Sequence, residues 1–129
     1  MAAEPPEIHR QTATAEAETG IEILSSLQDW QAALARPALL VLWGGAHCGV
    51  CQAIRPRLEA LMAEHFAAAA LAYVDCADAP DLCAQQGVFS LPVLRFYVHG
   101  QLALEYARSF SLQQVLGDVQ RVLALAADD

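Results

Sequence analysis

Residues 39–51 read LLVLWGGAHCGVC, and this stretch decides both the fold and the chemistry. The run from Ala38 to Trp43 has no polar position, as expected of a central strand that is covered on both faces. Two glycines then break the strand, and Cys48 and Cys51 follow at the start of a segment with helical periodicity. A C-x-x-C pair between a buried strand and a helix, within a βαβ pattern, indicates a redox pair.

The place of the two cysteines on the helix predicts different roles for them. If the helix begins near Cys48, its sulfur lies at the helix N-terminus, where unpaired backbone N–H groups and the macrodipole favour an anion. Cys51 lies about one turn further in, close enough for a disulfide but more buried and slower to ionise. We therefore expect Cys48 to be the nucleophile and Cys51 the resolving thiol.

The rest of the chain alternates between strand and helix patterns. Pro56 falls inside the helical periodicity after Cys51, which continues past it, so we expect a bend and not an end. The segment Asp78-Ala79-Pro80-Asp81 has the pattern of a helix cap with proline at the first helical position, and we expect it to open a short helix through Leu82 to Gln86. The order predicts an α/β fold with a mixed sheet. The predicted strands cover 21–24, 38–43, 71–74, 93–98 and 102–107, and the other helices start near Leu27, Cys48 and Leu112.

Length and composition predict one domain over residues 20–129, preceded by a mobile tail over 1–19 that has little to bury. Fifteen acidic residues against seven basic ones argue against nucleic acid or an anionic membrane as a partner. No stretch approaches the roughly 20 apolar residues of a transmembrane helix. The first residues lack the features of a signal peptide, so we expect a cytoplasmic protein, in which cysteines indicate redox chemistry or metal.

Several features in register resemble the thioredoxin family over about residues 21–126. Pro56 lies five residues after Cys51, where family members carry a helix-kinking proline, and the segment 87–92 resembles the one that ends in the family's cis-proline. An aromatic strand position and the turn after it also match, at Phe96 and Gly100. The resemblance implies a thioredoxin fold, with a central mixed five-stranded sheet flanked by about four helices.

The resemblance also implies a site and an activity. Pro92 would follow a cis bond, lie against the disulfide and present a backbone edge to a substrate peptide. The other docking positions implied are Gly49, Val50, Leu91, Ala107 and Arg108. The activity implied is that of a thiol–disulfide oxidoreductase, in the first place a disulfide reductase. It would act on protein disulfides, take electrons from a thioredoxin-reductase-like donor and need no cofactor.

Departures from the family pattern concern the chemistry. The family's buried acid, which accepts the proton of the resolving thiol, is Leu42 here, so resolution should be slower. The family's tryptophan before the first cysteine is His47, which either tunes the Cys48 thiolate or is a solvated loop residue. Val50 replaces a proline between the cysteines. Arg108 replaces a glycine, and it either selects acidic substrates or points outward.

Cys76 and Cys83 form a second pair of cysteines. They can form a regulatory disulfide, but spacing does not fix their geometry, and we favour buried free thiols. A zinc site built from all four cysteines is disfavoured, because only one pair has the usual ligand spacing, and we predict no metal site in the chain. A metal or iron–sulfur cluster held between two chains by C-x-x-C stays open.

A function from another class is a thioredoxin-fold binding module or chaperone-like adaptor with little redox activity. The loss of the buried acid at Leu42 favours it. The two cysteines and Pro92, all in register, favour the enzyme, since fold alone does not give function.

Overall fold

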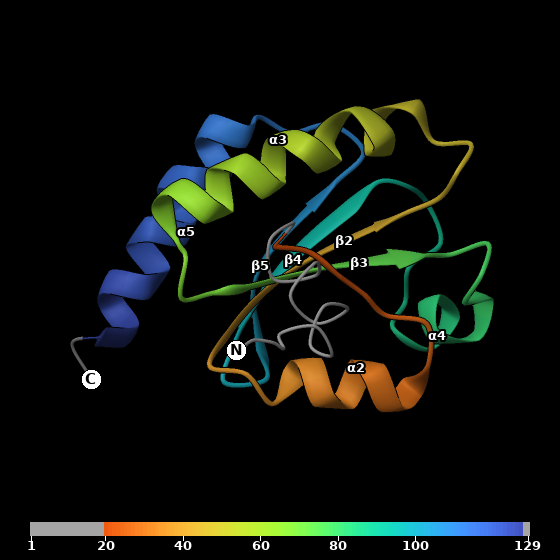
Figure 1. Ribbon diagram of the computed structural model, residues 1–129, viewed down its shortest axis with the longest axis horizontal. Helices are drawn as coiled ribbons and strands as arrows, with labels where there is room; N and C mark the ends of the chain where they lie inside the picture. The colour runs from red at the N-terminus through yellow and green to blue at the C-terminus, as the bar shows by residue number, and fades with distance from the viewer. Residues whose placement is uncertain (1–19, 128–129) are drawn as a thin grey trace, which may run out of the picture.

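The computed structural model describes residues 20–127, so the tail predicted over 1–19 lies outside the described residues (Figure 1). Five strands and four helices follow one another in this part of the chain. The strands are β1 (Glu22–Ile23), β2 (Ala38–Gly44), β3 (Ala70–Asp75), β4 (Val93–Val98) and β5 (Gln101–Ala107). The helices are α2 (Leu27–Leu34), α3 (Gly49–His65), α4 (Pro80–Gln85) and α5 (Leu112–Ala127).

The strands form one mixed sheet in the order β1-β3-β2-β4-β5, which confirms the predicted fold class. β1 and β2 run parallel to β3, whereas β4 is antiparallel to both β2 and β5. All seven residues of β2 are buried, as their apolar sequence predicts for a strand covered on both faces. The carboxyl ends of β2 and β3 lie side by side at Gly44 and Asp75. Each cysteine pair comes in the chain just after one of these two strand ends.

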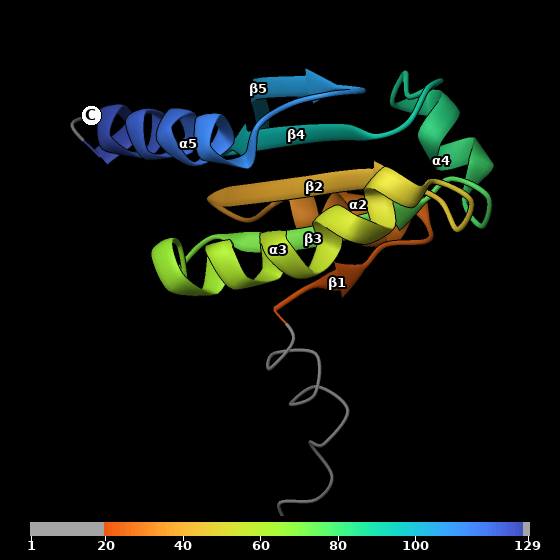
Figure 2. The same ribbon diagram turned by 90° about the horizontal axis from the view of Figure 1, so that it is seen from above.

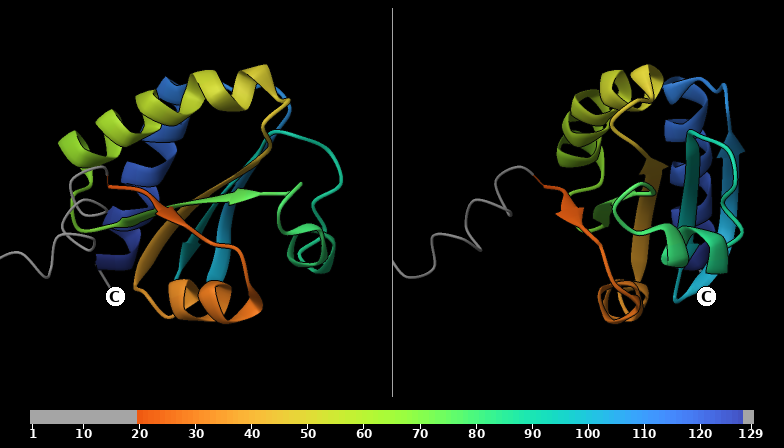
Figure 3. Two further views of the ribbon diagram at one scale, coloured as in Figure 1. Left: turned by 45° about the vertical axis from the view of Figure 1, so that its right-hand side comes forward. Right: turned by 90° about the vertical axis from the view of Figure 1, so that its right-hand side faces the viewer.

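Helices cover both faces of the sheet. α3 and α5 lie on one face, and Figure 2 shows α3 along the β1–β3 side and α5 along the β4–β5 side. α2 and α4 lie on the other face, and Figure 3 shows α2 across the sheet from α3. Two buried tryptophans meet on the α2 face, where the rings of Trp30 and Trp43 have centroids 5.1 Å apart.

Local sequence explains most element ends. Ser26 caps α2 by accepting the backbone N–H of Asp29 at 3.0 Å. α3 continues through Pro56 to His65, as its periodicity predicts. Between β4 and β5, His99 and Gly100 adopt φ values of 50° and 79°, the left-handed pair of a tight hairpin turn. Within residues 20–127, no helix is both long and apolar enough to cross a membrane.

Helix α4 begins within the predicted cap segment 78–81. Pro80 takes the first helical position, as predicted, and the N-cap is Ala79, which makes no side-chain capping bond. The Asp75 carboxylate instead accepts the backbone N–H of Ala77 at 2.8 Å and organises the turn before the helix. The competing Asx-type turn at the end of β3 therefore takes the place of the cap.

Candidate redox site

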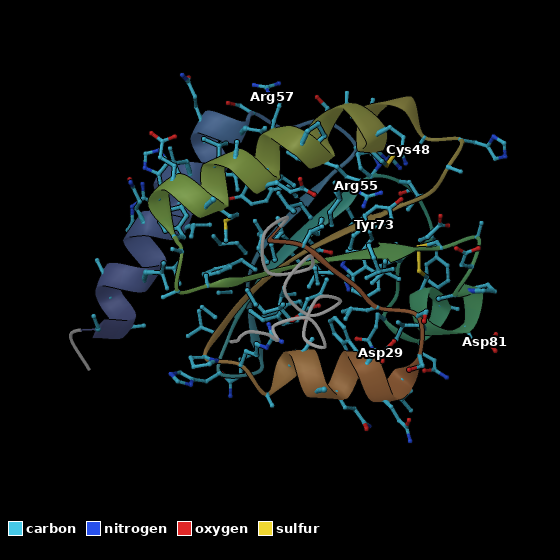
Figure 4. The ribbon with its side chains drawn as sticks, viewed as in Figure 1. Asp29, Cys48, Arg55, Arg57, Tyr73 and Asp81 are labelled. Atoms are coloured by element: carbon cyan, nitrogen blue, oxygen red, sulfur yellow. A yellow bond between two sulfur atoms is a disulfide. The ribbon has the colours of Figure 1, made fainter. Side chains whose placement is uncertain are left out.

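Cys48 lies where the turn after β2 becomes helix α3. It is the N-cap of α3, with extended backbone angles (φ −95°, ψ 100°), and its N–H donates to the Gly45 carbonyl at 3.1 Å. Cys48 Sγ accepts the backbone N–H of Cys51 at 3.2 Å. The predicted start of the helix at Cys48 is thus confirmed, and Figure 4 shows Cys48 at that end of α3.

Cys48 and Cys51 are joined by a disulfide, with their Cα atoms 5.2 Å apart. Cys48 is partly exposed, whereas Cys51 is fully buried (0% exposed). After reduction, the Cys51 N–H and the other free N–H groups of the first turn would stabilise a thiolate at Cys48. Cys51 lies further along the helix and away from water, so the pair is asymmetric in the sense that the predicted roles require.

Gly44, the last residue of β2, lets the strand approach the buried sulfur. A Cβ at this position would lie 2.8 Å from both Cβ and Sγ of Cys51, which no real side chain tolerates. The same Cβ would lie 3.1 Å from Cε1 of Tyr73 on β3. The space around Cys51 Sγ is therefore filled by the Gly44 backbone and by the Tyr73 ring.

The loop before β4 brings the predicted docking residues to the same edge. The Leu91–Pro92 peptide bond is cis. Leu91 lies against the Cys48 turn, because its Cδ1 would be 3.5 Å from a Cβ on Gly45. The Pro92 carbonyl accepts the backbone N–H of Arg108 at 2.8 Å, and Ala107 pairs with Val93 across β4 and β5.

Gly49 and Val50, in the first turn of α3, are exposed, and Val50 retains 51% of its surface. Sequence reasoning missed Phe89, which precedes Leu91 by two residues and is 83% exposed. The signal available for it was an aromatic residue in a loop next to the predicted cis-proline. Val50 and Leu91 thus form an apolar rim beside the partly exposed Cys48, and the docking role of these residues stays a prediction.

The positions that depart from the family pattern have distinct surroundings. Leu42 is fully buried among apolar side chains on the α3 face, with no carboxylate in its place. His47 is exposed in the turn before Cys48. Arg108 is exposed and has a φ of 70°, a conformation that glycine adopts far more easily. The backbone here therefore keeps the shape of a glycine position, although the residue has changed.

Tyr73 is a second residue that sequence reasoning left out of the site. It is the register partner of Leu42 across the parallel β2–β3 pair. The Arg55 guanidinium from α3 lies over its ring, 4.1 Å from the centroid, and Figure 4 shows both residues below the first half of α3. The continuous apolar run of β3 fits a buried ring, but no sequence signal fixes which residue of a parallel strand lies opposite Leu42.

The expectation that Cys76 and Cys83 are free thiols is wrong, since they are joined by a second disulfide with Cα atoms 5.7 Å apart. Cys76 follows β3 and Cys83 lies on α4, so the short helix folds back over the turn and brings the sulfurs together. Among the described residues, no cysteine is free, and no group of three or more His, Cys, Asp or Glu side chains is arranged to hold a metal ion.

Similarity to known proteins agrees with this architecture. A thioredoxin from Trypanosoma brucei brucei is 14% identical and superposes with a TM-score of 0.72, over 81% of this chain and 91% of that one. A mutant thioredoxin from Halobacterium salinarum is 21% identical, with a TM-score of 0.69 and coverage of 75% and 85%. Thioredoxin O2 from Arabidopsis thaliana is 20% identical, with a TM-score of 0.69 and coverage of 80% and 95%.

At these identities the structural neighbours show the fold alone. The family model named Thioredoxin, however, matches residues 22–120, which is most of the chain and includes both cysteines of the C-x-x-C pair, the cis-proline and the β4–β5 hairpin. The chain therefore belongs to the thioredoxin family.

Proposed function

We propose that the protein is a thiol–disulfide oxidoreductase that reduces protein disulfides through Cys48 and Cys51. The observation that carries the proposal is the asymmetry of the pair. One sulfur is partly exposed at the N-terminus of a 17-residue helix and accepts a backbone N–H, and the other is fully buried one turn further on. This is the arrangement that a nucleophile and a resolving thiol need.

The reaction follows from this geometry in two exchanges. The Cys48 thiolate attacks one sulfur of a substrate disulfide, the substrate S–S bond breaks, and the other substrate sulfur leaves with the electron pair. Cys51, as thiolate, then attacks Cys48 Sγ, the Cys48–Cys51 bond forms, and the second substrate thiolate leaves. The substrate gains two electrons and the protein becomes the disulfide, which a reductase of the thioredoxin-reductase type returns to the dithiol.

Substrate docking is assigned to the rim around Cys48. A peptide would lie along Leu91 and Pro92, with Gly49, Val50 and Ala107 on either side, and Arg108 would favour acidic side chains next to the substrate disulfide. His47 would add positive charge beside the thiolate when it is protonated. The cytoplasm, with its thiol-reducing pool, is the compartment that this role fits.

Two single variants test the assignment. Cys48→Ser should abolish the reduction of a protein disulfide such as that of insulin, whereas Cys51→Ser should accumulate a mixed disulfide between Cys48 and the substrate, seen by mass spectrometry. Cys76→Ala combined with Cys83→Ala is the matched control and should retain turnover. Equal activity in Cys48→Ser and the unmodified protein would end the proposal.

A second candidate is a binding module in which the rim acts by contact. Leu42 favours this reading, because the proton acceptor that the family places there is absent and the side chain is fully buried. Turnover of the unmodified protein separates the two candidates. A binding module would capture a peptide but reduce its disulfide no faster than the Cys48→Ser, Cys51→Ser double variant, whereas the proposed enzyme would lose all turnover in that double variant.

A further inference from the structure

Tyr73 places a buried hydroxyl group near Cys51, the proposed resolving thiol. The proposed mechanism does not yet use this hydroxyl. Its ring fills the space next to Gly44, where a single added Cβ would touch both Tyr73 Cε1 (3.1 Å) and Cys51 Sγ (2.8 Å). Cε1 is the ring carbon beside the one that carries the hydroxyl. The side chain is only 3% exposed, so the hydroxyl faces protein and not water.

The proton of the buried Tyr73 hydroxyl has no acceptor. Among residues 20–127, Tyr73 Oη and Trp43 Nε1 are the two buried side-chain polar atoms without a close hydrogen bond, and Trp43 belongs to the core cluster on the opposite face of the sheet. The Gln52 amide donates to the Gly45 carbonyl at 3.2 Å and also approaches the Tyr73 oxygen as a donor, so it lowers the pKa of Tyr73 but cannot accept its proton. A buried O–H whose proton has no partner is unfavourable, so its presence in the native fold needs an explanation.

The oxidation state of Cys51 decides whether such a partner exists. A disulfide sulfur is a weak acceptor, whereas a thiolate is a strong one, and hydrogen bonds to ionised groups are the strong class. We propose that, in the reduced protein, the Tyr73 hydroxyl donates a hydrogen bond to Cys51 and stabilises its thiolate, in place of the help that the family takes from an acid at the Leu42 position. This inference rests on the proposed redox function and names a further residue for it.

The charged groups around Tyr73 make it a donor and not a base. Burial raises the pKa of Tyr73 most, and the carboxylates of Asp75 and Asp78 raise it further. Arg55 on α3 and the Gln52 amide oppose this effect. Because the pKa of Tyr73 is raised overall, the hydroxyl keeps its proton throughout the range in which thiols ionise.

The chemical step keeps this proton in place. In the mixed disulfide, the Cys51 thiol loses its proton to water, and its thiolate is held by the Tyr73 O–H. The thiolate attacks Cys48 Sγ, the Cys48–Cys51 bond forms, and the bond from Cys48 to the substrate sulfur breaks with the electron pair on the leaving thiolate. Tyr73 therefore ends the step as it began it, and it acts by raising the thiolate fraction of Cys51.

The test titrates Cys51 directly. The full chain with Cys48→Ser keeps one thiol at the site, so its ionisation is not coupled to a second group, and the Cβ chemical shift of labelled Cys51 reports it against pH. Tyr73→Phe, which removes only the hydroxyl, should lower the thiolate fraction near neutral pH about tenfold, the size expected for a hydrogen bond to a charged group. Tyr97→Phe, a buried tyrosine on the other face, should leave the titration unchanged.

Two further measurements make the outcome decisive. If Tyr73→Phe is poorly folded, 3-fluorotyrosine at position 73 replaces it, because a more acidic hydroxyl is a better donor and should raise the thiolate fraction without loss of packing. A merely structural role would lower the melting temperature and leave the titration in place, which would overturn the proposal. The titration uses no substrate, so it stands apart from the turnover and trapping experiments that test the redox function.

Discussion

The two disulfides lie at the same edge of the sheet and have similar exposure, yet their surroundings differ in charge. Cys48 and Cys76 are each partly exposed, while Cys51 and Cys83 are each buried. Exposure therefore does not tell the two pairs apart. The difference lies in what surrounds the exposed sulfur of each pair.

Cys48 caps a 17-residue helix and its sulfur already accepts a backbone N–H. Cys76 instead lies between Asp75 and Asp78, four residues before a six-residue helix that carries Asp81 in its first turn. Donors favour a thiolate at Cys48, and carboxylates disfavour one at Cys76. Because local charge differs in this way, we expect the Cys48–Cys51 bond to be the reactive couple and the Cys76–Cys83 bond to be a structural tie.

The largest effect should come from restoring an acid behind the reactive pair. Leu42→Asp buries a carboxyl among apolar side chains and should cost about 3 kcal/mol of folding free energy or more. Leu42 and Gly44 lie on the same face of β2, so the new group would be behind Cys51 and could take its proton. We expect turnover per folded molecule to rise near neutral pH.

Leu42→Asn is the matched control for that experiment, since it has a similar shape but cannot accept the proton. Turnover is scored against the folded fraction, followed by circular dichroism. An equal gain in both variants, or no gain in either, would show that the missing acid does not limit the reaction.

Removing the structural tie should mainly affect stability. Cys76→Ala with Cys83→Ala opens a short loop and should lower the free energy of unfolding by about 2 to 3 kcal/mol on the chain-entropy account. Urea denaturation measures this, and hydrogen exchange should place the loosening in α4. A large loss of turnover in the folded double variant would mean that the second pair takes part in the chemistry, and the contrast drawn above would fail.

A smaller effect on stability should come from the close packing of Gly44 against Cys51. Gly44→Ala places a Cβ 2.8 Å from Cys51 Sγ and should cost about 1 to 3 kcal/mol through overpacking, with slower closure of the Cys48–Cys51 disulfide. The control is Gly117→Ala in α5, where nothing lies within 4 Å of the added atom. It should stabilise the protein by about 0.5 to 1 kcal/mol. If both variants behave alike in thermal unfolding, the close approach at Gly44 is not what holds Cys51.

Features around the Cys48–Cys51 pair that depend on local spacing could be predicted from the sequence. The start of α3 at Cys48, its passage through Pro56 and the apolar β2 all follow from periodicity and helix-end chemistry. The second disulfide did not follow, because the approach of Cys76 to Cys83 depends on how α4 turns back after β3. Spacing along the chain carries no information on that angle.

Tyr73 escaped prediction for a related reason. Its position opposite Leu42 is set by the register of two parallel strands, and that register is fixed by the packing of the α3 crossover between them. Phe89 escaped because its position in a loop beside the predicted cis-proline is a sequence signal, but its exposure depends on how that loop packs. The features that the sequence did not predict thus depend on tertiary packing. The place of Cys48 at the start of a helix depends on local sequence and could be predicted.

An equilibrium redox titration of the full chain against glutathione tests the central claim most directly, with free thiols alkylated at each potential and mapped by mass spectrometry. We expect one two-electron transition for Cys48 with Cys51, at a reducing potential and separate from the transition of Cys76 with Cys83. If no disulfide forms between Cys48 and Cys51 at any potential, the two thiols are not a redox couple and the account is contradicted.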